Sequence, residues 1–183
     1  GMGAYSPVPH ISADIINKAL TEILIPTASA MVEEGRPFTG ILYAGLIATA
    51  EGPKVIEFNA RFGDPETQVI LPRLKSDFLD VVENVLDAVD MELEWSDESA
   101  VGIVMAANGY PGDYEKGSII KGLNYVDIHT HVYHAGTNKN DMGECVTNGG
   151  RVLLLAAMDQ TLEKKKKKAY RELEGIECKG LYY

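Results

Sequence analysis

The sequence has few cysteines, few aromatic residues and fewer basic than acidic residues. Its two cysteines, Cys145 and Cys178, lie far apart and do not form a C-x-x-C motif, so we expect free thiols of a cytosolic protein rather than a disulfide framework. The 17 basic and 27 acidic residues give a net charge of −10. Because a field of that sign repels a phosphate backbone, we do not expect nucleic acid as a partner.

A long hydrophobic run is not evident either. The most apolar stretch, residues 40–50, is shorter than the ~20 residues that cross a bilayer, and Tyr43 and Gly45 interrupt it. We therefore expect no membrane partner. The opening GMGAYSP lacks the charged start and apolar centre of a secretory signal, and a chain that begins with Gly1 is expected to be cut from a longer one. The composition, 45% hydrophobic and 24% charged, is typical of a globular protein with a packed core.

Hydrophobic periodicity predicts an α+β protein. Apolar residues recur at helical spacing from Ser12, a suitable cap, to Gly35, which suits the left-handed position after a helix, while Pro26 bends or restarts the helix. A second amphipathic helix over residues 78–89 would be capped by Ser76 or Asp77. Between these helices, residues 39–49 and 54–62 flank a Glu-Gly-Pro turn and predict a β-hairpin.

The second half has a different pattern. After about residue 90, short apolar runs separated by turn residues predict a small, mostly antiparallel β unit, with strands at residues 100–107, 118–120, 126–132 and 152–157. The Gly149-Gly150 pair is interpreted as a tight hairpin between two strands. A last helix over residues 160–174 is expected to bury one face, made of Leu162, Ala169, Tyr170 and Leu173.

The stretch EFNARFGDPE, residues 57–66, carries the most chemistry. If residues 54–62 form one strand, Glu57, Asn59 and Arg61 share a face, and the alternating apolar side chains, from Ile56 to Phe62, anchor a core on the other. Carboxylate and amide oxygens are ligands that magnesium accepts together with water and phosphate. An arginine suits a transferring phosphoryl group. A phosphoryl-transfer site is one interpretation, and the solvated face of a half-exposed strand is the other.

The segment EFNARFGDPETQ resembles the signature of the phosphoribosylamine–glycine ligase family, also called glycinamide ribonucleotide synthetases, which are ATP-grasp enzymes of purine biosynthesis. The stretches GMGAYSPVPH, FTGILYAGLIAT, EGPKVIEFN, RLKSDF, NGYPGDYEKG, HAGT and TNGGRVL resemble the same family in the same order. The resemblance covers essentially the whole chain. ATP-grasp carboxylases share the E-x-N-x-R strand but not the following F-G-D-P-E-T-Q, so another ATP-grasp enzyme such as a biotin-dependent carboxylase is disfavoured.

The resemblance implies roles for five residues. Glu57 and Asn59 match the family's ligands for Mg²⁺ or Mn²⁺, and Arg61 matches the arginine expected to stabilise charge on the transferring phosphoryl group. Asp64 and Glu66 are candidates for holding the ammonium group of glycine, although Asp64 before a proline is equally explained as a turn residue. The implied substrates are ATP, glycine and 5-phosphoribosylamine, and the implied location is the cytoplasm.

The resemblance also implies the architecture. We expect the C-terminal part of an ATP-grasp subdomain over residues 1–91, followed by a small β-rich, barrel-like C-terminal domain over residues 92–183. The family's N-terminal domain and nucleotide-gripping lysines have no counterpart here, so the missing N-terminal domains are the expected partner and the chain by itself is expected to be inactive. The alternative is a non-catalytic module whose contacts serve assembly.

Two other features have less specific explanations. His129, His131 and His134 form a weak zinc pattern, because His134 would point away from the other two on a strand. The five consecutive lysines from Lys164 to Lys168 wrap more than one helical turn, which favours a solvated helix surface over a focused anion site.

Overall fold

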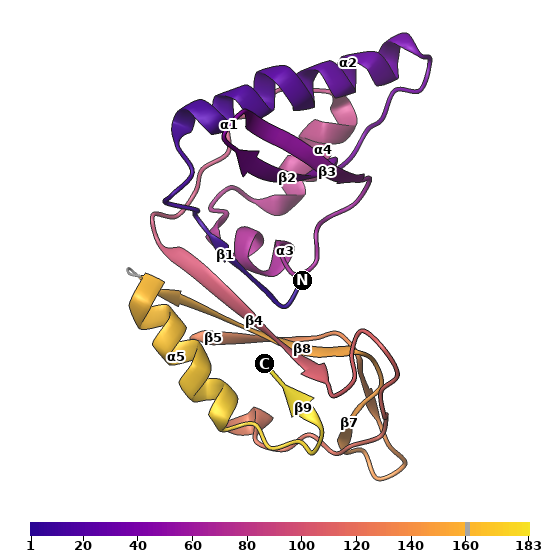
Figure 1. Ribbon diagram of the computed structural model, residues 1–183, viewed down its shortest axis with the longest axis vertical. Helices are drawn as coiled ribbons and strands as arrows, with labels where there is room; N and C mark the ends of the chain where they lie inside the picture. Colours follow the sequence, from indigo (N-terminus) through magenta and orange to yellow (C-terminus); the bar gives the residue numbers. More distant parts are fainter. Residues whose placement is uncertain (160–161) are drawn as a thin grey trace. The chain divides into compact units, whose positions relative to one another are not determined.

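The computed structural model describes residues 1–159 and 162–183, and the chain forms two compact units (Figure 1). Unit 1 comprises Gly1–Pro7, Asp64–Lys75 and Trp95–Tyr183, and unit 2 comprises Val8–Gly63 and Ser76–Glu94. Both units are assembled from separate stretches of sequence. The domain boundary expected between residues 91 and 92 stays a prediction. The α+β class is confirmed.

Unit 1 is built on a five-stranded antiparallel sheet with the strand order β1-β4-β8-β5, in which β9 also pairs with β4. The strands are β1 (Gly3–Ser6), β4 (Ser99–Ala107), β5 (Thr130–His134), β8 (Arg151–Asp159) and β9 (Leu181–Tyr182). A separate hairpin joins β6 (Thr137–Lys139) to β7 (Cys145–Thr147). The β-rich character expected of the second half is therefore present, as an open sheet with a hairpin beside it.

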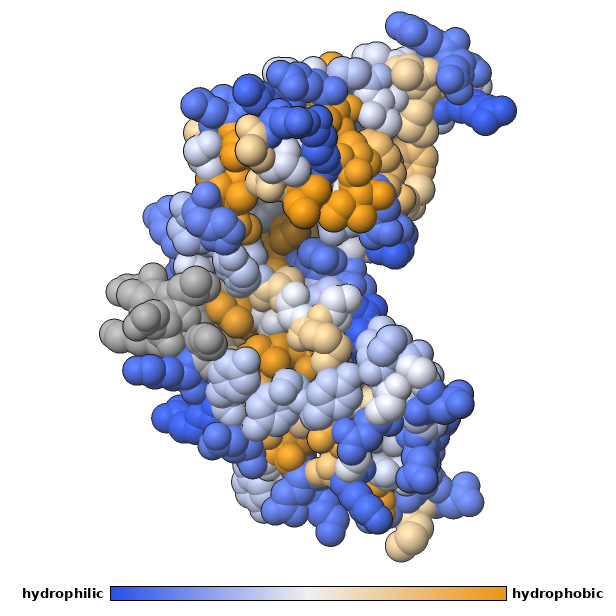
Figure 2. Space-filling model, in the orientation of Figure 1, coloured by the Kyte–Doolittle hydropathy of each residue, from blue (hydrophilic) through white to orange (hydrophobic). Residues whose placement is uncertain are grey.

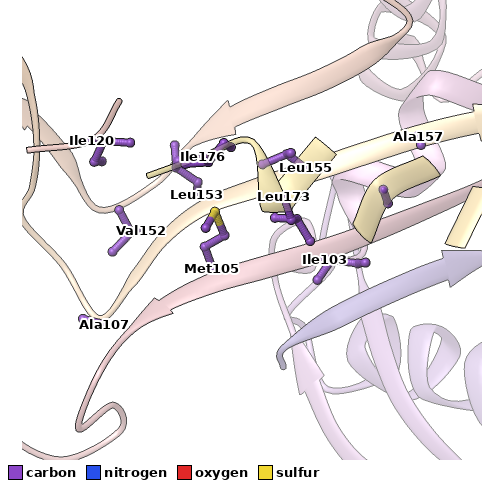
Figure 3. Packing of buried hydrophobic residues seen from close by; sticks show 11 residues of the cluster. Ile103, Met105, Ala107, Ile120, Val152, Leu153, Leu155, Ala157, Leu173 and Ile176 are labelled. Atoms are coloured by element: carbon purple, nitrogen blue, oxygen red, sulfur yellow. The ribbon is translucent and has the colours of Figure 1, made fainter. Parts of the chain in front are cut away.

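One face of this sheet carries the main hydrophobic core. Helix α5 (Leu162–Glu174) packs over β4 and β8, and Figure 3 shows Leu173 of the helix beside Leu153 and Leu155 of β8. Of the face predicted for this helix, Ala169 and Leu173 are buried, Tyr170 is 38% exposed, and the side chain of Leu162 lies outside the described residues, as do residues 160 and 161.

The opposite face of the sheet is covered by a short helix. Helix α3 (Thr67–Ile70) follows the Asp64-Pro65 turn, and its Val69 is 1% exposed. A Cβ atom on Gly102 of β4 would lie 2.9 Å from Val69 Cγ1, so the glycine provides the space that Val69 fills. Leu154 of β8 packs on this same face with Val104 and Ala156.

A β-bulge interrupts the pairing of β4 with β8. Met105 pairs with Leu153 and Ala106 pairs with Arg151, so Val152 is an extra residue on β8. Val152 and Leu153 both belong to the core cluster under α5, although consecutive strand residues normally point to opposite faces. The bulge therefore reverses the alternation of side chains at the beginning of β8.

Arg73 and Lys168 each join separate segments of unit 1 through side-chain hydrogen bonds. The guanidinium of Arg73, in the 3-10 turn Leu71–Arg73 (η2), donates to Ser6 Oγ at 2.6 Å and to the carbonyl oxygens of Glu98 and Ser96 at 2.7 and 3.0 Å. Lys168 Nζ lies 2.8 Å from Asp127 Oδ1, and this hydrogen bond holds the pKa of the Asp127 carboxyl below its ordinary value. Lys167 is exposed as expected, whereas the side chains of the three preceding lysines lie outside the described residues.

Three local predictions for the second half were wrong. Residues 118–120 form a single bridge, Ile119 to Val146, rather than a strand. Residues 126–132 do not form one strand, because the chain turns after the 3-10 turn Leu123–Tyr125 (η3), with the Thr130 amide donating to the Asp127 carbonyl, and β5 begins only at Thr130. The Gly149-Gly150 pair connects β7 to β8 without a hairpin, since β7 pairs with β6 instead.

Unit 2 contains a β-hairpin and two helical segments. Strands β2 (Tyr43–Thr49) and β3 (Gly52–Asn59) confirm the hairpin, although both strands are shorter than predicted. The first segment runs through α1 (Ala13–Ala19), a π-helical turn, Leu20–Leu24 (η1), and α2 (Ile25–Glu33), and the second is α4 (Phe78–Asp87). Pro26 lies in the first turn of α2, directly after the π-helical turn, and the helical backbone continues through it.

The predicted caps of the helices of unit 2 are confirmed, although α4 ends at Asp87 and not at residue 89. Ser12 Oγ accepts from the Ile15 amide at the start of α1, and Asp77 rather than Ser76 caps α4. Gly35 has a φ of +70°, and the Arg36 amide donates back to the Met31 carbonyl at 2.8 Å, which is the Schellman arrangement that satisfies carbonyls at a helix end.

Much of the apolar surface of unit 2 is open. Of its hydrophobic residues, all of which are described, Ala19 alone is buried, and Ile56 is 67% exposed. Figure 2 shows broad hydrophobic areas on this unit, in the upper part of the view. The apolar face of β3 therefore lacks the core that we predicted it would anchor.

The first helical segment of unit 2 has the length and hydropathy of a membrane-spanning helix. The stretch Ala13–Glu33 is long and apolar enough to cross a bilayer by length and composition alone, a test that residues 40–50 fail and that core helices of soluble proteins also pass. The expectation of no membrane partner overlooked this stretch and stays a prediction.

Replacing Leu155 by Ala should lower the free energy of unfolding of unit 1 by about 2–5 kcal/mol, because the side chain is fully buried under α5 and its loss leaves a cavity. Urea denaturation followed by the fluorescence of Trp95, the single tryptophan, measures this change. Ile128→Ala is the matched control, since Ile128 is 90% exposed. Equal effects of the two substitutions would contradict the packing in Figure 3.

Candidate functional site

Glu57 and Asn59 lie on one face at the end of β3. Asn59 Nδ2 donates to Glu57 Oε1 at 3.1 Å, so the two side chains lean toward each other. Gly45 of β2 pairs with Glu57, and a Cβ atom on Gly45 would lie 3.2 Å from Glu57 Cγ. The glycine thus leaves room for the glutamate side chain to lie across the hairpin.

A β-bulge lies directly before this pair. Gly45 pairs with Glu57 and Leu46 pairs with Val55, which leaves Ile56 as the extra residue on β3. Bulges often re-aim side chains next to functional sites. Here the bulge separates the alternation of residues 52–55 from that of Glu57 and Asn59, so the earlier half of the strand does not share their register.

The donor chemistry of this pair fits a divalent cation. The side-chain N–H of Asn59 donates to the Glu57 carboxylate. Rotation about the Cβ–Cγ bond of Asn59 would put its oxygen in place of its nitrogen, so that a cation could bind between the Asn59 oxygen and the Glu57 carboxylate. One carboxylate and one amide oxygen leave positions for water and phosphate, as magnesium requires. In the part of the chain that the structure describes, three or more His, Cys, Asp or Glu side chains nowhere gather into a metal-binding group.

Arg61 was predicted to share a strand face with Glu57 and Asn59, and this prediction was wrong. Strand β3 ends at Asn59, so the alternation of strand side chains does not extend to Arg61. Its Nη1 atom donates to the Phe62 carbonyl at 2.8 Å. The Phe62 ring lies against that of Phe78 on α4, with centroids 6.0 Å apart, and this contact holds the segment that carries Arg61 within unit 2.

Asp64 belongs to unit 1 and is held by two side chains. Its Oδ2 atom lies 2.9 Å from Arg151 Nη2, and its Oδ1 atom accepts from Gln68 Nε2 at 3.0 Å. Glu66 directly precedes α3, and its carbonyl accepts from the Val69 and Ile70 amides. The turn role of Asp64 is therefore present, while the glycine-binding role of Asp64 and Glu66 stays a prediction.

Sequence reasoning missed two arginines with several hydrogen bonds in unit 1: Arg151, which binds Asp64, and Arg73, which binds Ser6, Ser96 and Glu98. Each belongs to a quoted family stretch, RLKSDF or TNGGRVL, but neither was given a role. A signal was available for Arg151, because a charged residue directly before the apolar run of β8 requires a partner if it is not solvated. Nothing in the spacing identifies Asp64, 87 residues away, as that partner.

The cysteines and histidines show ordinary surroundings. Cys145 and Cys178 are free thiols, and burial raises the pKa of both, which disfavours the nucleophilic thiolate. His134 Nδ1 lies 3.0 Å from Thr137 Oγ1. These contacts are those of structural side chains.

Unit 1 also contains a cavity of about 460 Å³ at the end of β4. Its lining includes the charged residues Asp113, Glu115 and Lys179. The residues of the 57–66 signature are not among those that line it. This cavity is therefore distinct from the candidate site.

Comparison with known families decides the relationship. Residues 1–67 match the phosphoribosylglycinamide synthetase ATP-grasp (A) domain, and residues 100–183 match the phosphoribosylglycinamide synthetase C domain. This chain belongs to the phosphoribosylglycinamide synthetase family. The family resemblance of the signature is thereby confirmed, and the signature spans the end of the A-domain match.

Curated members of the phosphoribosylglycinamide synthetase family extend beyond this chain. Phosphoribosylamine–glycine ligases from Halalkalibacterium halodurans and Listeria innocua are 57% and 52% identical to it across its whole length. The chain spans 42% and 44% of their lengths.

Solved structures share the fold. A crystal structure of phosphoribosylamine–glycine ligase from Thermotoga maritima, 36% identical, matches with a TM-score of 0.87 over 100% of this chain and 45% of that one. The biotin carboxylase domain of the Hydrogenobacter thermophilus 2-oxoglutarate carboxylase, in complex with MgADP and bicarbonate, matches with a TM-score of 0.65 over 99% of this chain and 40% of that one. At 15% identity, the second likeness concerns the fold alone.

Adding Mn²⁺ to the ¹⁵N-labelled chain should broaden the amide resonances around Glu57 and Asn59, because a paramagnetic ion at this pair relaxes nearby nuclei. Glu57→Gln should remove the broadening, since it replaces the one carboxylate of the donor pair. Glu83→Gln, the same change on α4 of the same unit, is the control and should leave it intact. Broadening centred elsewhere, or unchanged in Glu57→Gln, would contradict the assignment.

Proposed function

We propose that this chain is the C-terminal part of a cytoplasmic phosphoribosylamine–glycine ligase, which joins glycine to 5-phosphoribosylamine with ATP to give glycinamide ribonucleotide, ADP and phosphate. The observation that carries the proposal is the hydrogen-bonded Glu57–Asn59 pair inside the family signature. Curated relatives with this name, at 57% and 52% identity, support it.

In the proposed reaction, the glycine carboxylate attacks the γ-phosphorus of ATP and releases ADP, which gives glycyl phosphate. The amine of phosphoribosylamine then attacks the acyl carbon and displaces phosphate. Phosphorylation converts a poor leaving oxygen into a good one, so no serine or cysteine nucleophile is needed. The amine loses its proton as the amide bond forms.

Glu57 and Asn59 would hold Mg²⁺ or Mn²⁺ through their side-chain oxygens. A divalent cation held there would supply positive charge to the phosphates of ATP. Arg61 adds a fixed positive charge next to this pair in the sequence, suited to oxygens that gain negative charge during transfer. Asp64 and Glu66 would bind the ammonium group of glycine.

The open apolar surface of unit 2 supports a role for the missing N-terminal domains. Side chains such as Leu79, Leu86 and Ile56 are more than 60% exposed. Exposed apolar patches of this kind usually mark contact surfaces. We therefore propose that upstream domains of the same enzyme cover this surface and supply the rest of the ATP site, and that the chain alone is inactive.

Asn59→Ala in the full-length ligase should lower kcat by about 100-fold or more, because one of two metal ligands is lost. Glycine-dependent ADP release measures kcat. Thermal unfolding should change little, since the side chain makes its one described bond to an exposed glutamate. Asn124→Ala, in the exposed turn before β5, is the control and should retain full activity. Wild-type turnover in Asn59→Ala would refute the ligand role, and wild-type protein without glycine-dependent ADP release would refute the proposed function.

A further inference from the structure

Arg151, the first residue of β8, makes three hydrogen bonds to the turn that carries Asp64 and to the chain start. Its Nη2 atom lies 2.9 Å from Asp64 Oδ2, and its Nη1 atom donates to the Asp64 carbonyl at 2.9 Å and to the Gly1 carbonyl at 3.3 Å. The side chain is 24% exposed. Binding the carboxylate and the main chain of one residue at once requires the planar fork of an arginine, because a lysine ammonium is a single point of charge.

The β-bulge at Val152 directs Arg151 to this turn. In an uninterrupted strand, Arg151 would share a face with Leu153, which lies in the core under α5. The extra residue moves Arg151 to the face of Leu154, the face on which α3 and Val69 pack. The pairing of Arg151 with Ala106, two residues after Val104 on that same face, agrees with this placement.

The backbone before Arg151 is fixed by close packing. A Cβ atom on Gly150 would lie 2.2 Å from the Tyr110 ring, and the Gly150 carbonyl accepts from the Ala107 amide at 2.7 Å. A side chain at this position would displace the ring or the strand. The close packing of Gly150 therefore fixes the position of the backbone that carries Arg151.

Asp64 transmits this constraint to α3. Its second carboxylate oxygen accepts from Gln68 Nε2, so Arg151, Asp64 and Gln68 form one chain of hydrogen bonds across the turn that contains Glu66. A carboxylate offers about four lone-pair sites, and these two side-chain bonds leave acceptor capacity on Asp64. The carboxylate is thus oriented without being saturated.

We infer that Arg151 is a positioning residue for the proposed ligase, and that it acts through Asp64 to hold the Asp64–Glu66 turn in the arrangement that receives the glycine ammonium group. Arg151, in the region that matches the C domain, would thus hold Asp64, in the region that matches the ATP-grasp (A) domain. This inference rests on the proposed function. The described hydrogen bonds of Arg151 go to Asp64 and Gly1, so its proposed effect on glycine is exerted through Asp64.

The first experiment uses the 183-residue chain and needs no activity. The amides of Val69 and Ile70 donate to the Glu66 carbonyl and report the order of the turn. Arg151→Met should speed their hydrogen exchange about tenfold relative to the wild-type chain, with a smaller increase in Arg151→Lys. Arg171→Met is the control, because Arg171 is 73% exposed and pairs with the adjacent Glu172. Unchanged exchange in Arg151→Met would overturn the inference.

The second experiment uses the full-length ligase. Arg151→Lys should raise the KM for glycine about tenfold with a smaller change in kcat, because the ammonium site is displaced while the metal ligands stay in place. The KM for ATP should stay within twofold, a split that general destabilisation would not produce. If Arg151→Met does not fold, Arg151→Lys alone decides the result. An unchanged KM for glycine in Arg151→Lys overturns the inference and leaves the proposed function standing. An inactive wild-type enzyme refutes the proposed function, and the exchange experiment then decides whether Arg151 holds the Asp64–Glu66 turn.

Discussion

The pairing of β4 with β8 is the interaction on which unit 1 depends. Each strand is buried along most of its length, and their shared faces receive α5 on one side and α3 on the other. The one irregularity in that pairing, the extra Val152, lets a single strand supply apolar side chains to the core and a guanidinium to the opposite face. The register of β4 with β8 consequently determines both the stability of unit 1 and the geometry of the Asp64–Glu66 turn.

Periodicity and capping chemistry predicted the local structure well where the decisive contacts are local. The Ser12 and Asp77 caps and the Gly35 helix end follow from side chains within a few residues of one another, and all three are present. The E-x-N pair could also be predicted, because two-residue spacing on a strand places both side chains on one face.

The rest depended on register, which alternation alone does not specify. A bulge adds a residue without changing the composition of a strand, so neither the extra Ile56 nor the extra Val152 leaves a signal in the apolar pattern. The apolar pattern also continues past the end of β3 at Asn59, so it did not show that Arg61 lies outside the strand. The contact between Arg151 and Asp64 joins residues 87 positions apart, and only the folded sheet brings them together.

The discontinuity of both units has a consequence for biosynthesis. Unit 2 has all of its residues once Glu94 has been added, whereas β1, which precedes unit 2 in the sequence, must wait for β4 to provide its pairing partner and for β8 to complete the sheet. Because chains are synthesised from the N-terminus at ~5–20 residues per second, residues 1–7 remain unpaired for several seconds while unit 2 can already fold. The order of folding on the ribosome therefore differs from the order of the sequence, because β1 is fixed only after β4 and β8, which are synthesised later, are available.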